Sequence, residues 1–278
     1  MKLINELITP FNEQKQIDIE EFNHLLNDAL INGNDETIIF SDYGDGYLLS
    51  LEEIEALINS INKENIHHTI FYFQLKNLIE DEKIITILNK SNIETIIINP
   101  PYGYYNQTGL FLYLKAILKK LKCKQIILQD SPINNKVCFH FQTLRKLLKT
   151  NHNIIAIYEN SLDISLIGLL KHNFPELKIY VNEKDLSLAL SKHLDGIISV
   201  ISITFGKDFL TIFEDQKCGF YNKILSDYLL LAHDILTFSN NSNLMKSYLR
   251  RLGYKSMEER LPLVKEKVDE ENIDLLLS

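Results

Sequence analysis

The chain has 278 residues and a formal net charge of −8, with 45% hydrophobic and 24% charged residues. This length and composition are typical of a single soluble globular domain. The negative charge argues against non-specific nucleic-acid binding, which requires a basic surface. Glycine occurs 10 times, about half of its average usage, and no glycine-rich phosphate-binding motif is present. We therefore expect neither a nucleic acid nor a nucleotide as partner.

The apolar runs of the sequence are of strand length, far short of the roughly 20 residues that cross a bilayer. The first residues do not have the pattern of a signal peptide. Cys123, Cys138 and Cys218 are odd in number, scattered, and without metal-ligand spacing. These features predict a reduced, cytoplasmic protein with no membrane contact, no metal and no other cofactor.

Short runs rich in β-branched residues alternate with amphipathic stretches up to about Ser199. Between these runs, apolar residues recur at helical spacing, and Ser50 with Glu53 forms a capping box at one helix start. Eight strands, each followed by a helix, predict an α/β protein with a (β/α)8 (TIM) barrel, and a doubly wound open sheet is the alternative. The predicted strands are Leu3–Ile8, Glu36–Phe40, Thr69–Phe73, Thr95–Ile98, Gln125–Leu128, Ile154–Tyr158, Leu177–Val181 and Gly196–Val200.

The strand pattern stops after Val200, and the rest of the chain is predicted to be helical. The predicted helices are Phe209–Phe213, Tyr221–Phe238, Leu244–Leu252 and Ser256–Val268. No proline- or glycine-rich linker separates this segment from the strands. We therefore divide the chain into a barrel core over residues 1–203 and C-terminal helices over residues 204–278 that pack on the barrel.

In a (β/α)8 barrel the active site lies at the carboxyl ends of the strands. We expect no histidine at this end of the barrel and Lys76 as its only lysine. His233 lies in a helical pattern and has no partner motif. The residues that follow predicted strands 2 to 7 are rich in Asp, Glu and Tyr: Asp42, Tyr43, Asp45, Gln74, Lys76, Asn99, Tyr102, Gln129, Asp130, Tyr158, Glu159, Asn182 and Glu183.

Four stretches of the sequence resemble the dihydrodipicolinate synthase and N-acetylneuraminate lyase family, which are pyruvate-dependent aldolases. The resemblance runs nearly end to end, and residues 195–202 match the family's eighth strand almost letter for letter. It implies a (β/α)8 barrel of the lyase class. In chain order, the stretches are LITPFNEQKQIDIEEF, PPYGYYNQTGLFLYLKAI, DGIISVIS and NLMKSYLRRLGYKSMEERLPL.

The family's catalytic positions hold different residues in this chain. Family members form a Schiff base between pyruvate and a lysine in a run like GIKE, and here Tyr158 stands at the lysine position. The family's catalytic tyrosine, in a run like LYNVP, is matched by Gln129. A phenol cannot form an imine, and an amide has no useful pKa for proton transfer. The resemblance therefore implies loss of the ancestral chemistry.

The carboxylate-binding positions differ as well. Asp42 and Tyr43 stand at the two threonines of the family's GTTGE loop, and Asn134 matches an arginine that many synthases hold. Tyr102 alone is retained, and in the family this tyrosine reaches across a dimer interface. The resemblance thus implies a homodimer or homotetramer. The ligand-binding positions that it implies are Asp42, Tyr43, Tyr102, Gln129, Asn134, Tyr158 and Ile198.

These substitutions favour a degenerate barrel without Schiff-base chemistry, a pseudoenzyme that binds a small molecule or regulates a partner. The alternative is a lyase or aldolase of the dihydrodipicolinate synthase or N-acetylneuraminate lyase type with altered residues, and a purely structural homo-oligomer is a third hypothesis. In the alternative, Lys76 becomes the amine or a divalent cation assists the reaction. The acidic residues considered for that cation are Asp42, Asp45, Asp130 and Glu159. We expect Tyr158 to point into the barrel mouth within contact range of Gln129.

Overall fold

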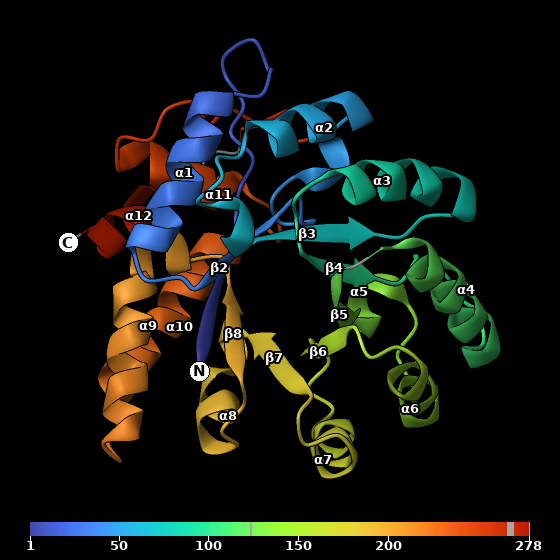
Figure 1. Ribbon diagram of the computed structural model, residues 1–278. Coiled ribbons are helices and arrows are strands. Elements are labelled where there is room, and N and C mark those ends of the chain that lie inside the picture. Colours follow the sequence, from blue (N-terminus) through green and yellow to red (C-terminus); the bar gives the residue numbers. More distant parts are fainter. Residues whose placement is uncertain (123, 266–269, 278) are drawn as a thin grey trace.

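The computed structural model describes residues 1–122, 124–265 and 270–277, and its strands close into a parallel barrel in the order β1 to β8 (Figure 1). The predicted (β/α)8 fold is confirmed, and the open sheet is wrong because β1 pairs with β8 as well as with β2. The strands are β1 (Lys2–Glu6), β2 (Glu36–Ile39), β3 (Thr69–Gln74), β4 (Thr95–Asn99), β5 (Gln125–Asp130), β6 (Ile154–Glu159), β7 (Lys178–Asn182) and β8 (Gly196–Ser199).

Alternate residues of each strand face the barrel interior, where β-branched side chains fill the space. The interior cluster consists mainly of isoleucines and tyrosines: Ile4, Ile38, Ile70, Tyr72, Ile97, Ile127, Ala156, Tyr158, Tyr180 and Ile198. The intervening residues face outward and join a larger core between the strands and the surrounding helices. Consequently, a side chain two residues beyond an interior isoleucine lies on the interior face, at the mouth of the barrel.

Helices cover the outside of the barrel, and several begin with a side-chain cap. The predicted capping box is present, with the Glu53 amide donating to Ser50 Oγ and the Ser50 amide donating to Glu53 Oε2. The helices of the first eight units are α1 (Ile19–Ile31), α2 (Leu51–Ser60), α3 (Leu78–Lys90), α4 (Gln107–Lys120), α5 (Pro132–Asn135), α6 (Phe141–Thr150), α7 (Ile164–Asn173), α8 (Leu186–Ser191) and α9 (Ser202–Lys217), with 3-10 turns η1 (Gly46–Leu48), η2 (Ile66–His68) and η3 (Glu183–Asp185).

The tail helices α10 (Lys223–Thr237), α11 (Asn243–Arg251) and α12 (Glu270–Leu277) gather with α9 and α1 on one side of the barrel (Figure 1). The helix predicted over Phe209–Phe213 is part of the longer α9, which runs across the proposed boundary at residue 203. That boundary stays a prediction. The helices predicted over Tyr221–Phe238 and Leu244–Leu252 correspond to α10 and α11.

The helix predicted over Ser256–Val268 is wrong for the described part of that range. Residues 256–265 form no helix, because tertiary contacts hold this segment against the start of the chain. Met257 makes a β-bridge with Phe11, and Arg260 donates to the Lys15 carbonyl oxygen. Pro262 also lacks the amide that a helix interior requires. Residues 266–268 of the predicted helix lie outside the described residues.

A buried ion pair joins the tail to the barrel. Lys246 of α11 donates to Asp45 Oδ2 at 2.6 Å, and Ser242 donates to both oxygens of the same carboxylate. The Lys246 and Asp45 side chains are 0% and 1% exposed. Lys246 and Arg260 also lie over the ring of Phe11, at 4.7 and 4.2 Å from its centroid. The tail is thus anchored to both the first and the second βα loops.

Among the described residues, no helix is long and apolar enough to cross a membrane. Cys138 and Cys218 are exposed free thiols, and Cys123 lies outside the described residues. The cytoplasmic location stays a prediction.

Candidate active site

A cavity of about 370 Å³ opens at the carboxyl ends of the strands. Its wall combines strand ends, loops and the tail helix α10, and it is unusually rich in tyrosines and side-chain amides. The lining residues are Glu6, Asp42, Tyr43, Tyr47, Tyr72, Gln129, Asn134, Tyr158, Asn160, Asn182, Lys184, Val200, His233, Thr237, Asn240 and Asn241.

The structure brings five of the seven predicted ligand-binding residues together in this cavity: Asp42, Tyr43, Gln129, Asn134 and Tyr158. The other two lie elsewhere. Ile198 is fully buried in the barrel interior among the other isoleucines, because it lies within β8 rather than beyond its end. Tyr102 is 70% exposed on the loop after β4 and does not line the cavity of this chain.

Tyr158 points into the barrel mouth, as predicted, and lies opposite Gln129 in the register of β6 and β5. Its hydroxyl oxygen accepts a long hydrogen bond of 3.4 Å from Asn182 Nδ2. Burial, and then the charge of Glu6, raise the pKa of the Tyr158 phenol well above its usual range. The phenol therefore stays protonated at neutral pH and is a hydrogen-bond donor rather than a base.

Two amide side chains of the cavity have buried oxygens without a partner among the described residues. These are Gln129 Oε1 and Asn160 Oδ1, and Gln129 is only 4% exposed. A buried polar atom without a hydrogen bond costs about 1–3 kcal/mol. A ligand or water that donates to these oxygens would remove this cost.

Glu6, at the end of β1, is a functional candidate that sequence reasoning missed. Burial raises the pKa of its carboxyl to about 7; the charges of Asp42 and Glu183 act in the same direction, and a hydrogen bond from Ser41 opposes them. A carboxyl that titrates near neutral pH is suited to general acid–base catalysis. The signal was available, because Glu6 follows the interior residue Ile4 by two positions on the same strand.

Asp42 and Tyr72 form a second polar group on the β2–β3 side of the cavity. The Tyr72 hydroxyl donates to Asp42 Oδ2 at 3.2 Å and accepts from Asn99 Nδ2 at 2.6 Å. Burial raises the pKa of the Asp42 carboxyl, and the hydrogen bond from Tyr72 opposes this effect. The Tyr72 proton is therefore engaged by Asp42.

The expectation that the mouth holds no histidine and only Lys76 as a lysine is wrong. His233 of α10 and Lys184 of η3 both line the cavity. His233 Nδ1 lies 2.5 Å from Glu183 Oε1, a partner 50 residues earlier in the chain, so a local motif could not reveal it. Lys76 lies instead in a neighbouring cavity of about 280 Å³, which shares Asp42, Tyr47 and Tyr72 with the first.

The acidic residues considered for a divalent cation are mostly engaged in structural contacts. Asp45 binds Lys246, Asp130 accepts from the Phe139 amide, and Glu159 accepts from the Ser161 and Asp163 amides. Within the described ranges, no group of three or more His, Cys, Asp or Glu side chains is placed to hold a metal ion. The four residues therefore do not converge on a common point.

The match to known proteins covers the whole architecture. Residues 1–275 match the family described as "Dihydrodipicolinate synthetase family". The chain belongs to this family. Relatives include a 4-hydroxy-tetrahydrodipicolinate synthase of Halalkalibacterium halodurans, 24% identical over 95% of this chain and 91% of the relative. Another, from Thermosipho africanus, is 28% identical over 93% of this chain and 90% of the relative.

A similar solved structure is a dihydrodipicolinate synthase of Bacillus anthracis. It superposes with a TM-score of 0.88 over 99% of this chain and 96% of that chain, at 21% sequence identity. At this identity the likeness shows the fold alone.

Proposed function

We propose that this member of the family is an aldolase-type lyase that works without a Schiff base, with Glu6 as its proton-transfer group and Tyr158 as the donor to the substrate carbonyl. The observation that carries this proposal is the Glu6 carboxyl, with a pKa of about 7, in the same cavity as the protonated Tyr158 phenol. The names of the relatives also favour an enzyme over a non-catalytic barrel.

In the proposed reaction the Glu6 carboxylate accepts a proton from the carbon next to a substrate carbonyl. The electron pair of the broken C–H bond forms a C=C bond, the π pair of the carbonyl moves to its oxygen, and the Tyr158 hydroxyl stabilises the resulting enolate by donating a hydrogen bond. The enolate carbon then forms a C–C bond with an aldehyde, whose oxygen takes the proton back from Glu6. Carboxyl bases paired with phenol donors in apolar surroundings are a known solution for enolate chemistry. The reverse sequence cleaves the bond.

The test is exchange of the methyl protons of pyruvate in D2O, followed by NMR. We expect the wild-type protein to accelerate exchange, with a rate that rises with pH through about 7 as Glu6 loses its proton. Glu6→Gln should reduce the rate by about 10²–10⁴-fold and remove that step, and Tyr158→Phe should reduce it by roughly 10²-fold.

Exposed Glu13→Gln is the matched control and should leave the rate unchanged. Addition of EDTA tests the metal-assisted form of the alternative, and we expect no effect. Borohydride treatment with pyruvate should give no stable adduct. An adduct on Lys76 or Lys184, found by mass spectrometry, would instead identify a relocated amine and contradict the proposal.

The second candidate is a non-catalytic barrel that binds a small molecule. Tyr158 and Gln129, at the positions that the resemblance assigns to the lysine and the catalytic tyrosine, favour it. The same exchange experiment separates the two candidates. A wild-type protein that binds small ligands but leaves pyruvate exchange at the buffer rate would support the binding protein.

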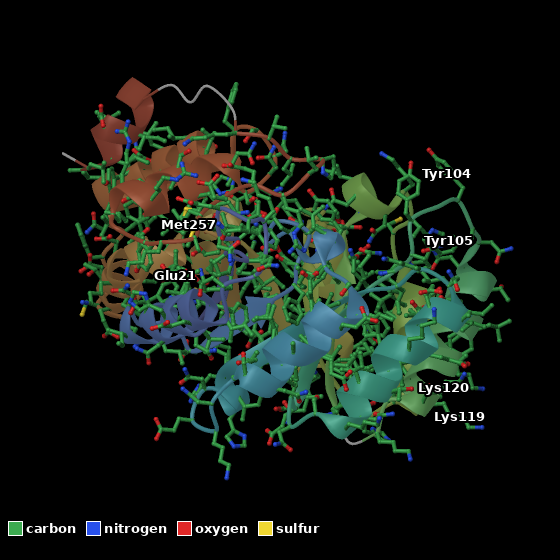
Figure 2. The ribbon with its side chains drawn as sticks, turned by 90° about the horizontal axis from the view of Figure 1, so that it is seen from above. Glu21, Tyr104, Tyr105, Lys119, Lys120 and Met257 are labelled. Atoms are coloured by element: carbon green, nitrogen blue, oxygen red, sulfur yellow. The ribbon has the colours of Figure 1, made fainter. Side chains whose placement is uncertain are left out.

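We also propose that the chain forms a homodimer or homotetramer through the loop after β4. Tyr102 and Tyr104 are 70% and 85% exposed there, and Figure 2 shows Tyr104 at the opposite end of the molecule from Met257 of the tail. Exposed tyrosines are typical of interface centres. We expect light scattering at micromolar concentration to give a dimer or tetramer, and Tyr104→Ser to shift it toward the monomer. A monomeric wild-type protein would contradict this proposal.

A further inference from the structure

The cavity has a second charged feature that the proposed reaction does not use. Lys184 of η3 and His233 of α10 lie on the tail side of its wall, close enough for their charges to interact. Glu6 and Asp42, by contrast, come from the ends of β1 and β2. The two cationic side chains thus lie where the tail meets η3, with Glu183 and Asp185 beside His233, whereas Glu6 and Asp42 lie at the first two strands.

The imidazole of His233 is held in one orientation by Glu183. Nδ1 lies 2.5 Å from Glu183 Oε1, and the Glu183 side chain is only 1% exposed. Nε2 lies 3.4 Å from Thr237 Oγ1, a long contact, and the Thr237 hydroxyl donates to the His233 carbonyl oxygen instead. The Nε2 side of a protonated ring is thus only weakly engaged by the described residues.

The electrostatic surroundings of His233 favour its charged form. Burial alone would lower its pKa, but the hydrogen bond to Glu183 and the charge of that carboxylate outweigh burial and raise the pKa above its ordinary value. Asp234 on the same helix acts in the same direction, and Lys184 opposes it. Asp185, on η3, interacts with the ring as well.

We propose that His233 and Lys184 bind an anionic oxygen group of the ligand, a carboxylate or a phosphate, and that Glu183 positions the imidazole for this contact. This inference rests on the proposed function and adds the polarity of the substrate. The anionic group lies against the tail helix, and the reacting carbon lies at Glu6. The opposite orientation would place the anion beside Glu6 and Asp42, where like charges repel it.

The arrangement makes α10 a specificity element of the barrel. Asn134 stands where the resemblance implies an arginine for the substrate carboxylate, so the strand 5 loop offers an amide in place of a cation. Lys184 and His233 supply positive charge from a different side of the same cavity. A ligand whose anionic group binds Lys184 and His233 is therefore oriented differently from one whose carboxylate binds an arginine at position 134.

The test is an NMR titration of the His233 ring signals, assigned by their loss in His233→Gln. The pKa of His233 is measured in sodium chloride, sodium acetate and sodium sulfate at equal ionic strength, with acetamide as the uncharged match for acetate. An anion bound beside the ring stabilises its charged form, so we expect acetate or sulfate to raise the pKa by about 0.5 unit and acetamide to leave it unchanged. A response to acetate alone identifies a carboxylate site, and a stronger response to sulfate identifies a phosphate site.

Three variants and an internal control complete the design. Lys184→Gln should reduce the response to anions, whereas exposed Lys192→Gln should not. Glu183→Gln should lower the pKa of His233 in chloride, because it removes the partner charge, and this readout separates positioning from a merely structural role. Exposed His67, beside Glu94 and at the amino end of β3, should not respond to acetate or sulfate beyond the effect of chloride.

The inference fails if the His233 pKa is indifferent to both anions or if Lys184→Gln leaves the response unchanged. Pyruvate exchange is measured on the same variants to separate the two proposals. Exchange that depends on Glu6 without an anion response at His233 would overturn only the inference. An anion response without any exchange would overturn the proposed reaction and leave the anion site in place.

Discussion

Two carboxyl groups at the same end of the barrel, the buried Asp45 and the half-buried Glu6, have opposite surroundings. Asp45, in the loop after β2, is bound by the Lys246 ammonium and by the Ser242 hydroxyl. Glu6, at the end of β1, faces the Asp42 and Glu183 carboxyl groups, and the hydrogen bond from Ser41 opposes the rise in its pKa that burial and these charges cause. The charge of Asp45 is thus compensated by an ammonium group, whereas the Glu6 carboxyl lies among other carboxyl groups.

This difference separates a structural carboxyl group from a chemical one. A buried charge with a well-placed partner holds two segments of the chain together. A buried carboxyl among like charges holds its proton to near neutral pH and releases it readily above that point. We therefore assign Asp45 to the barrel–tail junction and Glu6 to catalysis.

Loss of the Asp45 partner should give the largest change in stability. Lys246→Met keeps the shape of the side chain but leaves a buried carboxylate unpaired, which costs about 3–5 kcal/mol. Urea unfolding measures this loss, and the double variant Asp45→Asn with Lys246→Met should recover part of it. Lys2→Met, at the exposed pair with Glu36, is the control and should cost no more than about 1 kcal/mol. A loss below 1 kcal/mol for Lys246→Met would show that the junction is not held by charge.

Removal of the Glu6 charge should change the stability less than Lys246→Met does, and in the opposite direction. The pKa of Glu6 is about 7 in the folded protein against 4.5 as the ordinary value, so the folded state holds the proton more tightly than the unfolded state. Stability should therefore fall as pH rises from about 4.5 to 7, by about 3 kcal/mol from this group. Glu6→Gln removes the titration and should stabilise the protein by about 2–3 kcal/mol at pH 8 relative to its effect at pH 4.5.

Urea unfolding at both pH values is the measurement, with Glu13→Gln as the exposed control. Equal effects of Glu6→Gln at the two pH values would show that Glu6 ionises normally. In that case the contrast with Asp45 would no longer hold.

The smallest effect is expected from restoring a lysine beside Glu6. Tyr158→Lys should give no pyruvate-dependent turnover of aspartate semialdehyde or N-acetylmannosamine, because the nearby carboxyl groups Glu6 and Glu183 favour the ammonium form. Turnover of about 1 per second in the variant would show that the carboxyl groups do not keep the introduced lysine in its ammonium form.

Local sequence patterns predicted the barrel well, because each strand is a short β-branched run and each interior residue follows from alternation. Tyr158 and Gln129 were placed together by the family resemblance rather than by a local pattern, and they lie in register on neighbouring strands. His233 could not be placed, because its position depends on how α10 packs across the mouth. The helix predicted over Ser256–Val268 was wrong in its described part because the bridge between Met257 and Phe11 overrides local helical preference.

The Phe11 ring, which lies under both Lys246 and Arg260, has a consequence for biosynthesis. Phe11 precedes both cations in the chain and is therefore translated before them, and both cations belong to the tail. Until the tail has been translated, Phe11 lacks these two contacts and Asp45 lacks its partner. The first two βα units therefore acquire their final packing only after the tail residues that contact them have been made.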